Sequence, residues 1–310
     1  MSPSCPAWAP PLLAVQFLTR VPVPFVSRLS EEVVRVGLSR AVAWFPLVGA
    51  LIGAVTAGTV LLAEQVWPRV VAVIIALIVE ARLTGAFHED AVADFCDGVG
   101  GGRDPAHTRQ IMKDSRIGTY GALGLTLAVA LRAVLTGLLD PAVLVFAIIA
   151  AAAFARLLAV IVMAIVPAIA LPSGSSAARG ASSPDASAAG TLLGASGLGK
   201  DVAAGTPLGA SGFGKDVAAG TPLGASGLGN DIAAGIRKRD VTLAFLTSLP
   251  GLIPFALVAP LALACALLAA IAFLVWFKPL LMRHVGGSTG DCLGFAAYIG
   301  QLFVLLAATA

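Results

Sequence analysis

The chain has 310 residues, of which 58% are hydrophobic and only 12% charged, and its mean hydropathy is +0.94. A water-soluble domain usually carries about 25% charged residues, so this composition excludes an ordinary soluble protein and predicts an integral membrane protein. The net charge of +3 is small, and the four cysteines lie too far apart to predict a zinc site or a disulfide framework.

Seven apolar stretches are long enough, or nearly so, to cross a bilayer, which takes about 20 residues. Segment 11–20 is too short, and a helix on the membrane surface and a plain N-terminal lead-in fit it equally. The apolar run 241–281 contains Pro250, Pro254 and Pro260, and we predict two spans there. The fold class is therefore all-α, a polytopic transmembrane helix bundle of about seven spans (six to eight). The predicted spans are 41–63, 70–87, 119–139, 141–166, 241–258, 260–277 and 292–309.

The basic residues lie mostly on one side of these spans. With seven spans, sixteen of the twenty Lys and Arg residues fall in 1–40, 88–118, 167–240 and 278–291. An excess of Lys and Arg marks the cytoplasmic face. We expect a multi-pass protein of the prokaryotic inner (cytoplasmic) membrane, with its N-terminal segment and its long loops in the cytoplasm.

Residues 172–235 interrupt the predicted transmembrane catalytic domain, which we place at 41–310. They are rich in Gly, Ala and Ser and hold three copies of a 15-residue repeat. Such a sequence lacks the apolar bulk to offset the entropy of ordering, which predicts a disordered cytoplasmic insertion. Two copies resemble the start of a phosphate-binding P-loop, but Asp201 and Asp216 stand where that loop needs Ser or Thr, so we expect no nucleotide site there.

The first polar block, 88–98, contains three aspartates on one helical face. Asp90, Asp94 and Asp97 are spaced i, i+4 and i+7, and like charges so placed repel one another unless a cation neutralises them. Oxygen ligands of this kind suit Mg²⁺. His88 directly precedes the set and is a candidate proton acceptor. The alternative is a solvated acidic helix end.

The second block, 98–121, begins with glycines and continues with cations. The glycines predict a tight turn whose amides bind an anion, and Gly98 is a candidate substrate contact. Lys113 and Arg116 are candidates for bearing negative charge on phosphate, and Asp114 is a further candidate metal ligand. We expect Arg103 and Arg109 only to set topology.

The third block, 283–294, is a glycine-rich turn before the last span. It is a weak motif alone and gains weight because it is predicted to share a membrane face with the other two blocks. Its candidate substrate contacts are Arg283, Gly286, Gly287, Thr289 and Gly290, and its candidate metal ligand is Asp291.

Four ionisable residues lie within predicted spans: Glu80, Arg82, Arg132 and Arg156. A charge at mid-bilayer costs about 2.5–3.5 kcal/mol on insertion scales, so such residues usually face a partner inside the bundle. We expect Glu80 or a bound phosphate to partner these arginines, and Arg156, the deepest, is a candidate substrate contact. Snorkelling to the interface accounts more simply for Arg82.

The three blocks together resemble the cobalamin synthase family, the adenosylcobinamide-GDP ribazoletransferases. The family pattern reads H-x-D-G-x-A-D-x-x-D-G, then I-M-K-D-S-R-I-G-x-x-G, then R-x-x-G-G-x-T-G-D-x-x-G. One departure is Ala91, where the family usually has Gly. The segments 17–24 and 44–53 are also similar to the family. The matching residues are His88, Asp90, Ala93, Asp94, Asp97 and Gly98; 111–118 with Gly121; and Arg283, Gly286, Gly287, Thr289, Gly290, Asp291 and Gly294.

The resemblance implies a reaction in which adenosylcobinamide-GDP is joined to α-ribazole, or its 5′-phosphate, with release of GMP. It implies Mg²⁺ held by Asp90, Asp94 and Asp97, with Asp114 or Asp291. Beyond these substrates and membrane lipid we expect no nucleic-acid partner, and the sequence leaves a homo-oligomer open.

Two alternatives remain open at this point. A CDP-alcohol phosphotransferase shares D-x-x-D-G, but Gly101 and Gly102 stand where its Ala-Arg belongs. A cation-coupled transporter normally places its site near the membrane midplane, whereas these blocks are predicted at the rim.

Overall fold

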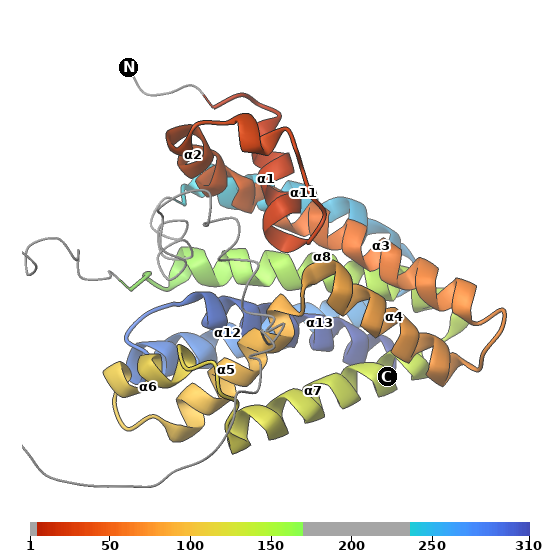
Figure 1. Ribbon diagram of the computed structural model, residues 1–310. Coiled ribbons are helices and arrows are strands. Elements are labelled where there is room, and N and C mark those ends of the chain that lie inside the picture. Colours follow the sequence, from red (N-terminus) through yellow and green to blue (C-terminus); the bar gives the residue numbers. More distant parts are fainter. Residues whose placement is uncertain (1–4, 170–235) are drawn as a thin grey trace, which may run out of the picture.

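The computed structural model describes residues 5–169 and 236–310, which form a bundle of α-helices (Figure 1). The predicted insertion at 172–235 lies outside the described residues. The helices are α1 (Ala9–Leu18), α2 (Glu31–Ala41), α3 (Phe45–Ala63), α4 (Arg69–Thr84), α5 (Phe87–Gly101), α6 (Pro105–Met112), α7 (Thr119–Leu138), α8 (Pro141–Ile165), α11 (Lys238–Val258), α12 (Pro260–His284) and α13 (Gly290–Ala308).

Six helices in the described residues are long and apolar enough to cross a membrane, and a bent pair, α4 with α5, brings the number to as many as seven. The prediction of a polytopic all-α bundle is confirmed. In α7 and α12 only 22% and 17% of the apolar window is buried, so both helices turn large apolar side chains outward, as lipid contact requires. The first candidate span differs from its predicted start, because α2 continues through a short 3₁₀ turn into α3 and the span begins at Glu31.

The apolar run after the insertion forms two helices, as predicted. The break falls at Ala259, whose backbone is not helical (φ −135°, ψ 66°), just before Pro260 at the first position of α12. The ring of a proline clashes with a helical conformation in the residue before it, while proline itself is well suited to a helix start. Pro250 and Pro254 are accommodated inside α11.

The predicted span 70–87 is wrong in its last three residues, because α4 ends at Thr84 and the chain bends by 88° into α5. Gly85 (φ 76°) and Ala86 (φ 57°) both adopt left-handed conformations at the bend. Their N–H groups donate to the carbonyl of Ala81, and the carbonyl of Leu83 accepts from the backbone N–H of Arg20 at 2.7 Å. The break is thus hydrogen-bonded internally and covered by the N-terminal segment.

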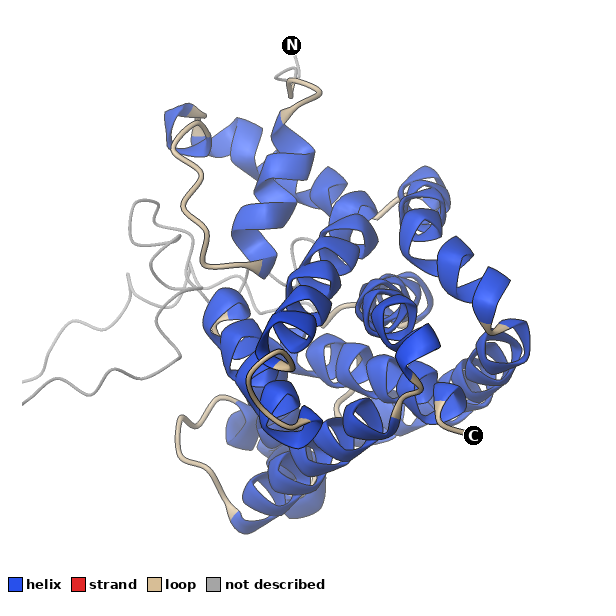
Figure 2. Ribbon diagram, turned by 90° about the vertical axis from the view of Figure 1, so that its right-hand side faces the viewer, coloured by secondary structure: helices blue, strands red, loops and turns tan. Residues whose placement is uncertain are grey.

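Helix α8 lies in the middle of the bundle, with α3, α11 and α13 packed against it (Figure 1). Figure 2 shows the described helices packed side by side in the view turned by 90°. Small residues permit the close approach. A Cβ on Gly49 of α3 would lie 2.4 Å from the carbonyl oxygen of Ala152, and one on Gly251 of α11 would lie 2.8 Å from Cβ of Ala153. Close packing of small residues is how helices associate in a membrane, where lipid is as apolar as the side chains and the hydrophobic effect does not drive association. It gives the site a rigid support.

All three polar blocks gather at one end of the bundle, at the left of Figure 1. Helix α5 packs against α6, α7 and α13, and α6 also contacts α12. Residues separated by almost two hundred positions in the chain therefore meet there.

Candidate functional site

Asp97 joins the first block to the second. Its two carboxylate oxygens accept hydrogen bonds from the backbone N–H groups of Gly118 at 2.6 Å and Gly121 at 2.8 Å, at the start of α7. A Cβ on either glycine would lie within 2.4 Å of that carboxylate, so the two glycines are what allows the contact. A carboxylate at a helix N-terminus satisfies amides that have no partner inside the helix. Asp97 therefore anchors α5 to α7, a role that the sequence did not reveal.

We expect Asp97→Ala to lower the free energy of unfolding by about 1–3 kcal/mol, because it leaves the N–H groups of Gly118 and of the buried Gly121 without their acceptor. Thermal unfolding in detergent measures this. A melting temperature equal to that of the unmodified protein would contradict the anchoring role.

Helices α5 and α13 touch at a pair of small residues. A Cβ on Gly294 would lie 2.4 Å from Cβ of Ala91. Ala91 is the position where the chain departs from the family pattern, and its methyl group is accommodated because Gly294 offers only a hydrogen. The contact brings Asp90, beside Ala91, into the neighbourhood of Asp291 in the first turn of α13.

The carboxylates of the first and third blocks form one group. Asp94 feels the negative charges of Asp90, Asp97 and Asp291. Asp291 feels the negative charge of Asp90 and the positive charge of Lys113 from the second block. Within the described residues, none of these four aspartates makes an ion pair with a Lys or Arg side chain. This uncompensated negative charge fits a divalent cation.

No three His, Cys, Asp or Glu side chains in the described part of the chain already meet as a metal cage. Mg²⁺ seldom uses such a cage, because it binds one or two carboxylates and completes its shell with water and substrate phosphate oxygens. Oxygen-only donors with an open side are therefore compatible with Mg²⁺ and unlike a structural zinc site.

Asp114 and Arg116 form a pair of their own. The Arg116 guanidinium lies 2.7 Å from the Asp114 carboxylate, and the Arg116 side chain is 87% exposed. This neighbour holds the pKa of the Asp114 carboxyl below its usual value. An exposed ion pair contributes little to stability, so the pair opens at small cost and leaves Arg116 available to an anion.

The third block is held in place by its backbone. Gly286 (φ 85°) and Gly287 (φ 150°) adopt conformations that favour glycine. The Ser288 N–H donates to the carbonyl of Pro167 at 2.9 Å, directly after α8. Thr289 caps α13 by accepting from the N–H of Cys292. The loop is therefore fixed to the end of the central helix, and Arg283 lies exposed in the last turn of α12.

Arg109 proves to be more than the topology signal that we expected. Its Nη1 donates to the carbonyl of Val285 at 2.6 Å, which ties α6 to the third block. A single arginine inside a basic stretch gives no sequence signal for such a long-range contact.

The predicted glycine turn at 98–102 is wrong. Gly98, Gly100 and Gly101 lie inside α5, which ends at Gly101. Gly98 packs against Met112 of α6, and Gly100 packs against the ring of Tyr120. These glycines serve close helix packing around the aspartates, and any contact of Gly98 with substrate stays a prediction.

His88 lies on the other face of α5 from Asp90, because two residues along an α-helix point about 200° apart. It is buried and lines an apolar cavity of about 40 Å³ together with Arg156, Phe45 and Gly290. Arg156 is also buried, its Nη1 donates to the carbonyl of Ala152 at 3.3 Å, and its Nε is unpartnered in the described structure. The structure thus separates these two candidates from the aspartate group.

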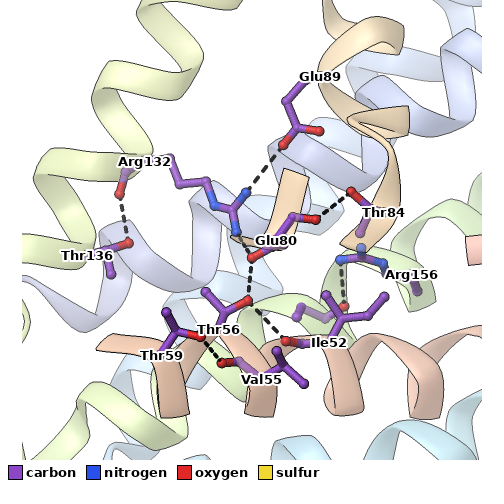
Figure 3. A network of polar contacts seen from close by, with 11 residues as sticks. Ile52, Val55, Thr56, Thr59, Glu80, Thr84, Glu89, Arg132, Thr136 and Arg156 are labelled. Carbon is purple, nitrogen blue, oxygen red and sulfur yellow. Dashed lines mark hydrogen bonds and ion pairs between the residues drawn. The ribbon is translucent and has the colours of Figure 1, made fainter. Parts of the chain in front are cut away.

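The expectation that Glu80 partners an intramembrane arginine is confirmed for Arg132. Figure 3 shows Arg132 between Glu80 and Glu89. Its Nη2 lies 2.5 Å from the Glu80 carboxylate and its Nη1 lies 3.5 Å from the Glu89 carboxylate. Thr56 donates to the same Glu80 carboxylate at 2.7 Å. Glu89 directly precedes Asp90 in the sequence, and its spacing from the other carboxylates carries no signal for this contact.

Comparison with known proteins places this chain in a family. The family model described as "Cobalamin-5-phosphate synthase" matches residues 10–215 and 208–309. No solved structure matches the chain.

Several curated relatives are described as adenosylcobinamide-GDP ribazoletransferase. The one from Shewanella amazonensis is 46% identical over 121 residues, which are 39% of this chain and 45% of that protein. The one from Leptothrix cholodnii is 47% identical over 122 residues, with the same two shares. The one from Azorhizobium caulinodans is 39% identical over 186 residues, 59% of this chain and 70% of that protein.

The chain spans about half the length of the first two of these relatives. The family match, in contrast, extends over most of the chain and includes the helices that carry all three blocks. The chain therefore belongs to the cobalamin-5-phosphate synthase family.

Proposed function

We propose that this protein joins adenosylcobinamide-GDP to α-ribazole, or to its 5′-phosphate, and releases GMP in a late step of cobalamin synthesis. The observation that carries the proposal is the meeting of Asp94, Asp90 and Asp291 with Lys113 at one end of the bundle. A diphosphate substrate calls for this combination of metal-binding carboxylates and cations.

The transfer needs little covalent help from the protein. A ribose hydroxyl forms a bond to the phosphorus next to the cobinamide linker, and the pyrophosphate bond to GMP breaks. Positioning and neutralisation of charge dominate such reactions. We assign these tasks to Lys113, whose positive charge acts on Asp291, and to Arg116, whose exposed side chain follows Lys113 by three residues.

Asp90, Asp94 and Asp291 would hold Mg²⁺, while Asp97 would contribute mainly through its anchoring of α7. A bound Mg²⁺ would supply charge neutralisation at the bridging and departing phosphate oxygens. His88 stays a candidate proton acceptor, although reaching a hydroxyl near the aspartates requires substrate to enter the cavity beside Arg156.

We further propose that the site faces the cytoplasm and that the membrane is the inner membrane. The support is the excess of Lys and Arg in the segments at this end of the bundle, because loops rich in Lys and Arg stay on the cytoplasmic side of a membrane. The nucleotide substrate would then be reached from the compartment in which nucleotides are made.

The decisive experiment is release of GMP by the purified protein in detergent, given Mg²⁺, adenosylcobinamide-GDP and α-ribazole. We expect GMP in proportion to enzyme and none when Mg²⁺ is removed with EDTA. A sample given CDP-alcohol substrates tests the rival transferase. If no GMP forms where a related synthase is active, the proposed function is wrong.

The insertion is expected to be dispensable for turnover. Loops at a surface tolerate changes of length, so deletion of 185–235 should leave the rate of GMP release within about twofold of the full chain. The deletion keeps the residues from Ile169 to 184 to connect α8 with α11. An inactive deletion variant that still inserts into membranes would show that the repeats take part in the reaction.

A further inference from the structure

The helix that carries the aspartates is attached to α7 at both of its ends. Near the C-terminal end of α5, the Asp97 carboxylate accepts hydrogen bonds from the backbone N–H groups of Gly118 and Gly121. At the beginning of α5, Glu89 lies 3.5 Å from the guanidinium of Arg132, which is 11 positions after Gly121 in α7. Two points of attachment on one rigid helix determine both the direction of α5 and its rotation about its own axis.

Arg132 also reaches across the break between α4 and α5. Glu80 precedes the bend at Gly85 and Ala86, and Glu89 follows it. One guanidinium holds both carboxylates, as Figure 3 shows. A fork with several N–H donors is suited to this task, and a lysine, which acts as a point charge, is less so.

The surroundings of Arg132 leave it little freedom. Its side chain is 4% exposed, and it lies over the ring of Tyr298 in α13, 5.8 Å from the centroid. Turning the Gln301 amide over, so that its oxygen faces Arg132, would let that oxygen accept from Nη2 at 2.7 Å. Arg132 thus relates α4, α5 and α7 to α13, the helix that supplies Asp291.

Among the described residues, Arg132 is the one cation within ion-pair distance of Glu89. Its Oε2 is buried with no hydrogen-bond partner in the described part of the structure. Successive residues on an α-helix point about 100° apart, so holding Glu89 toward α7 turns Asp90 toward a different side of α5. That side is the one on which Asp291 lies.

We propose that Arg132 is a positioning residue: by gripping Glu80 and Glu89 across the α4–α5 break, it sets the angle at which α5 presents Asp90 and Asp94 to Asp291. This inference rests on the proposed function insofar as it concerns turnover. The geometry of the break is testable without turnover.

The test compares Arg132→Gln, Arg132→Lys and the milder Glu89→Gln with the unmodified protein. Partners that orient metal ligands typically contribute 10–100-fold to metal affinity, so we expect Arg132→Gln and Glu89→Gln to raise the Mg²⁺ concentration for half-maximal GMP release by about tenfold or more. The KM for α-ribazole should change much less, and Arg132→Lys should recover part of the loss.

Hydrogen exchange gives the readout that is independent of activity. Amides of residues 84–92 should exchange at least about tenfold faster in Arg132→Gln and Glu89→Gln, because the loss of the contact makes local opening of this segment easier. Amides in the middle of α8 should stay protected. The matched control is Arg82→Gln, an exposed arginine in the last turn of α4, for which neither quantity should change.

The double variant Arg132→Gln/Glu89→Gln completes a double-mutant cycle. If the two residues act through one contact, the double variant should be no worse than Arg132→Gln alone, whereas independent effects would add. Exchange that rises equally in all helices, or an unchanged Mg²⁺ requirement with unchanged exchange at 84–92, overturns the proposal. If the unmodified protein releases no GMP, the proposed function fails, and the exchange data alone decide whether Arg132 fixes the break.

Discussion

Asp94→Asn is expected to reduce GMP release by about 100- to 1,000-fold, the scale on which loss of one preorganised electrostatic contact acts on a reaction of this kind. Asn keeps the size of the side chain and removes its charge. Asp94 lies among three other carboxylates, so the substitution also removes repulsion in the metal-free protein. The melting temperature in detergent should therefore stay the same or rise while turnover is lost. Activity and thermal unfolding measured on one preparation check both parts.

The matched control is Asp140→Asn at the beginning of α8. Asp140 accepts from the N–H of Ala142 at 2.7 Å as a helix cap, and Asn caps a helix about as well. Turnover and stability should both be retained. If Asp94→Asn keeps its turnover as well, Asp94 is not a metal ligand and the carboxylate group has another purpose.

The spans were largely predictable because lipid imposes a strong constraint on the sequence. A segment such as 141–166 has no alternative to a helix in a bilayer, since its backbone polar groups must be satisfied internally. The two spans around Pro260 followed from the same logic and from the effect of proline on its predecessor.

The break after Thr84 was hidden for a physical reason. Gly85 in a left-handed conformation is a common helix end, but Ala86 adopts one too, and alanine carries no sequence signal for it. The conformation is maintained by contacts distant in the sequence, among them the Arg20 N–H on the Leu83 carbonyl. Hydropathy alone joined α4 to the first residues of α5.

The site was predictable in its residue types and less so in its geometry. Helical spacing correctly placed Asp90, Asp94 and Asp97 on one face of α5, yet only the tertiary structure shows that Asp97 caps α7 while Asp291 takes a place beside Asp94. His88 stood near the aspartates in the sequence and lies on the opposite face of the helix. The glycines of 98–102 looked like an anion-binding turn and serve helix packing.

Gly294→Ala tests whether the distance between α5 and α13 controls the site. Its new methyl group would lie 2.4 Å from Cβ of Ala91, so the two helices must move apart. Overpacking of this kind costs about 1–3 kcal/mol, which outweighs the gain in helix propensity. Because the same movement separates Asp90 from Asp291, we expect GMP release to fall by about tenfold, as a 1 Å displacement of catalytic groups commonly causes losses of that order or more.

The compensating change is available in the same contact. Ala91→Gly removes the methyl group that Gly294→Ala would meet, so the double variant Ala91→Gly/Gly294→Ala should recover most of the lost turnover. Residues in direct contact show such coupling, whereas distant residues do not. Gly137→Ala in α7 is the control, since nothing lies within 4 Å of its new Cβ and helix propensity alone should act. If Gly294→Ala is as active as Gly137→Ala, the close approach of α5 and α13 does not position the aspartates. If the double variant stays as impaired as Gly294→Ala, the loss has a cause other than the contact with Ala91.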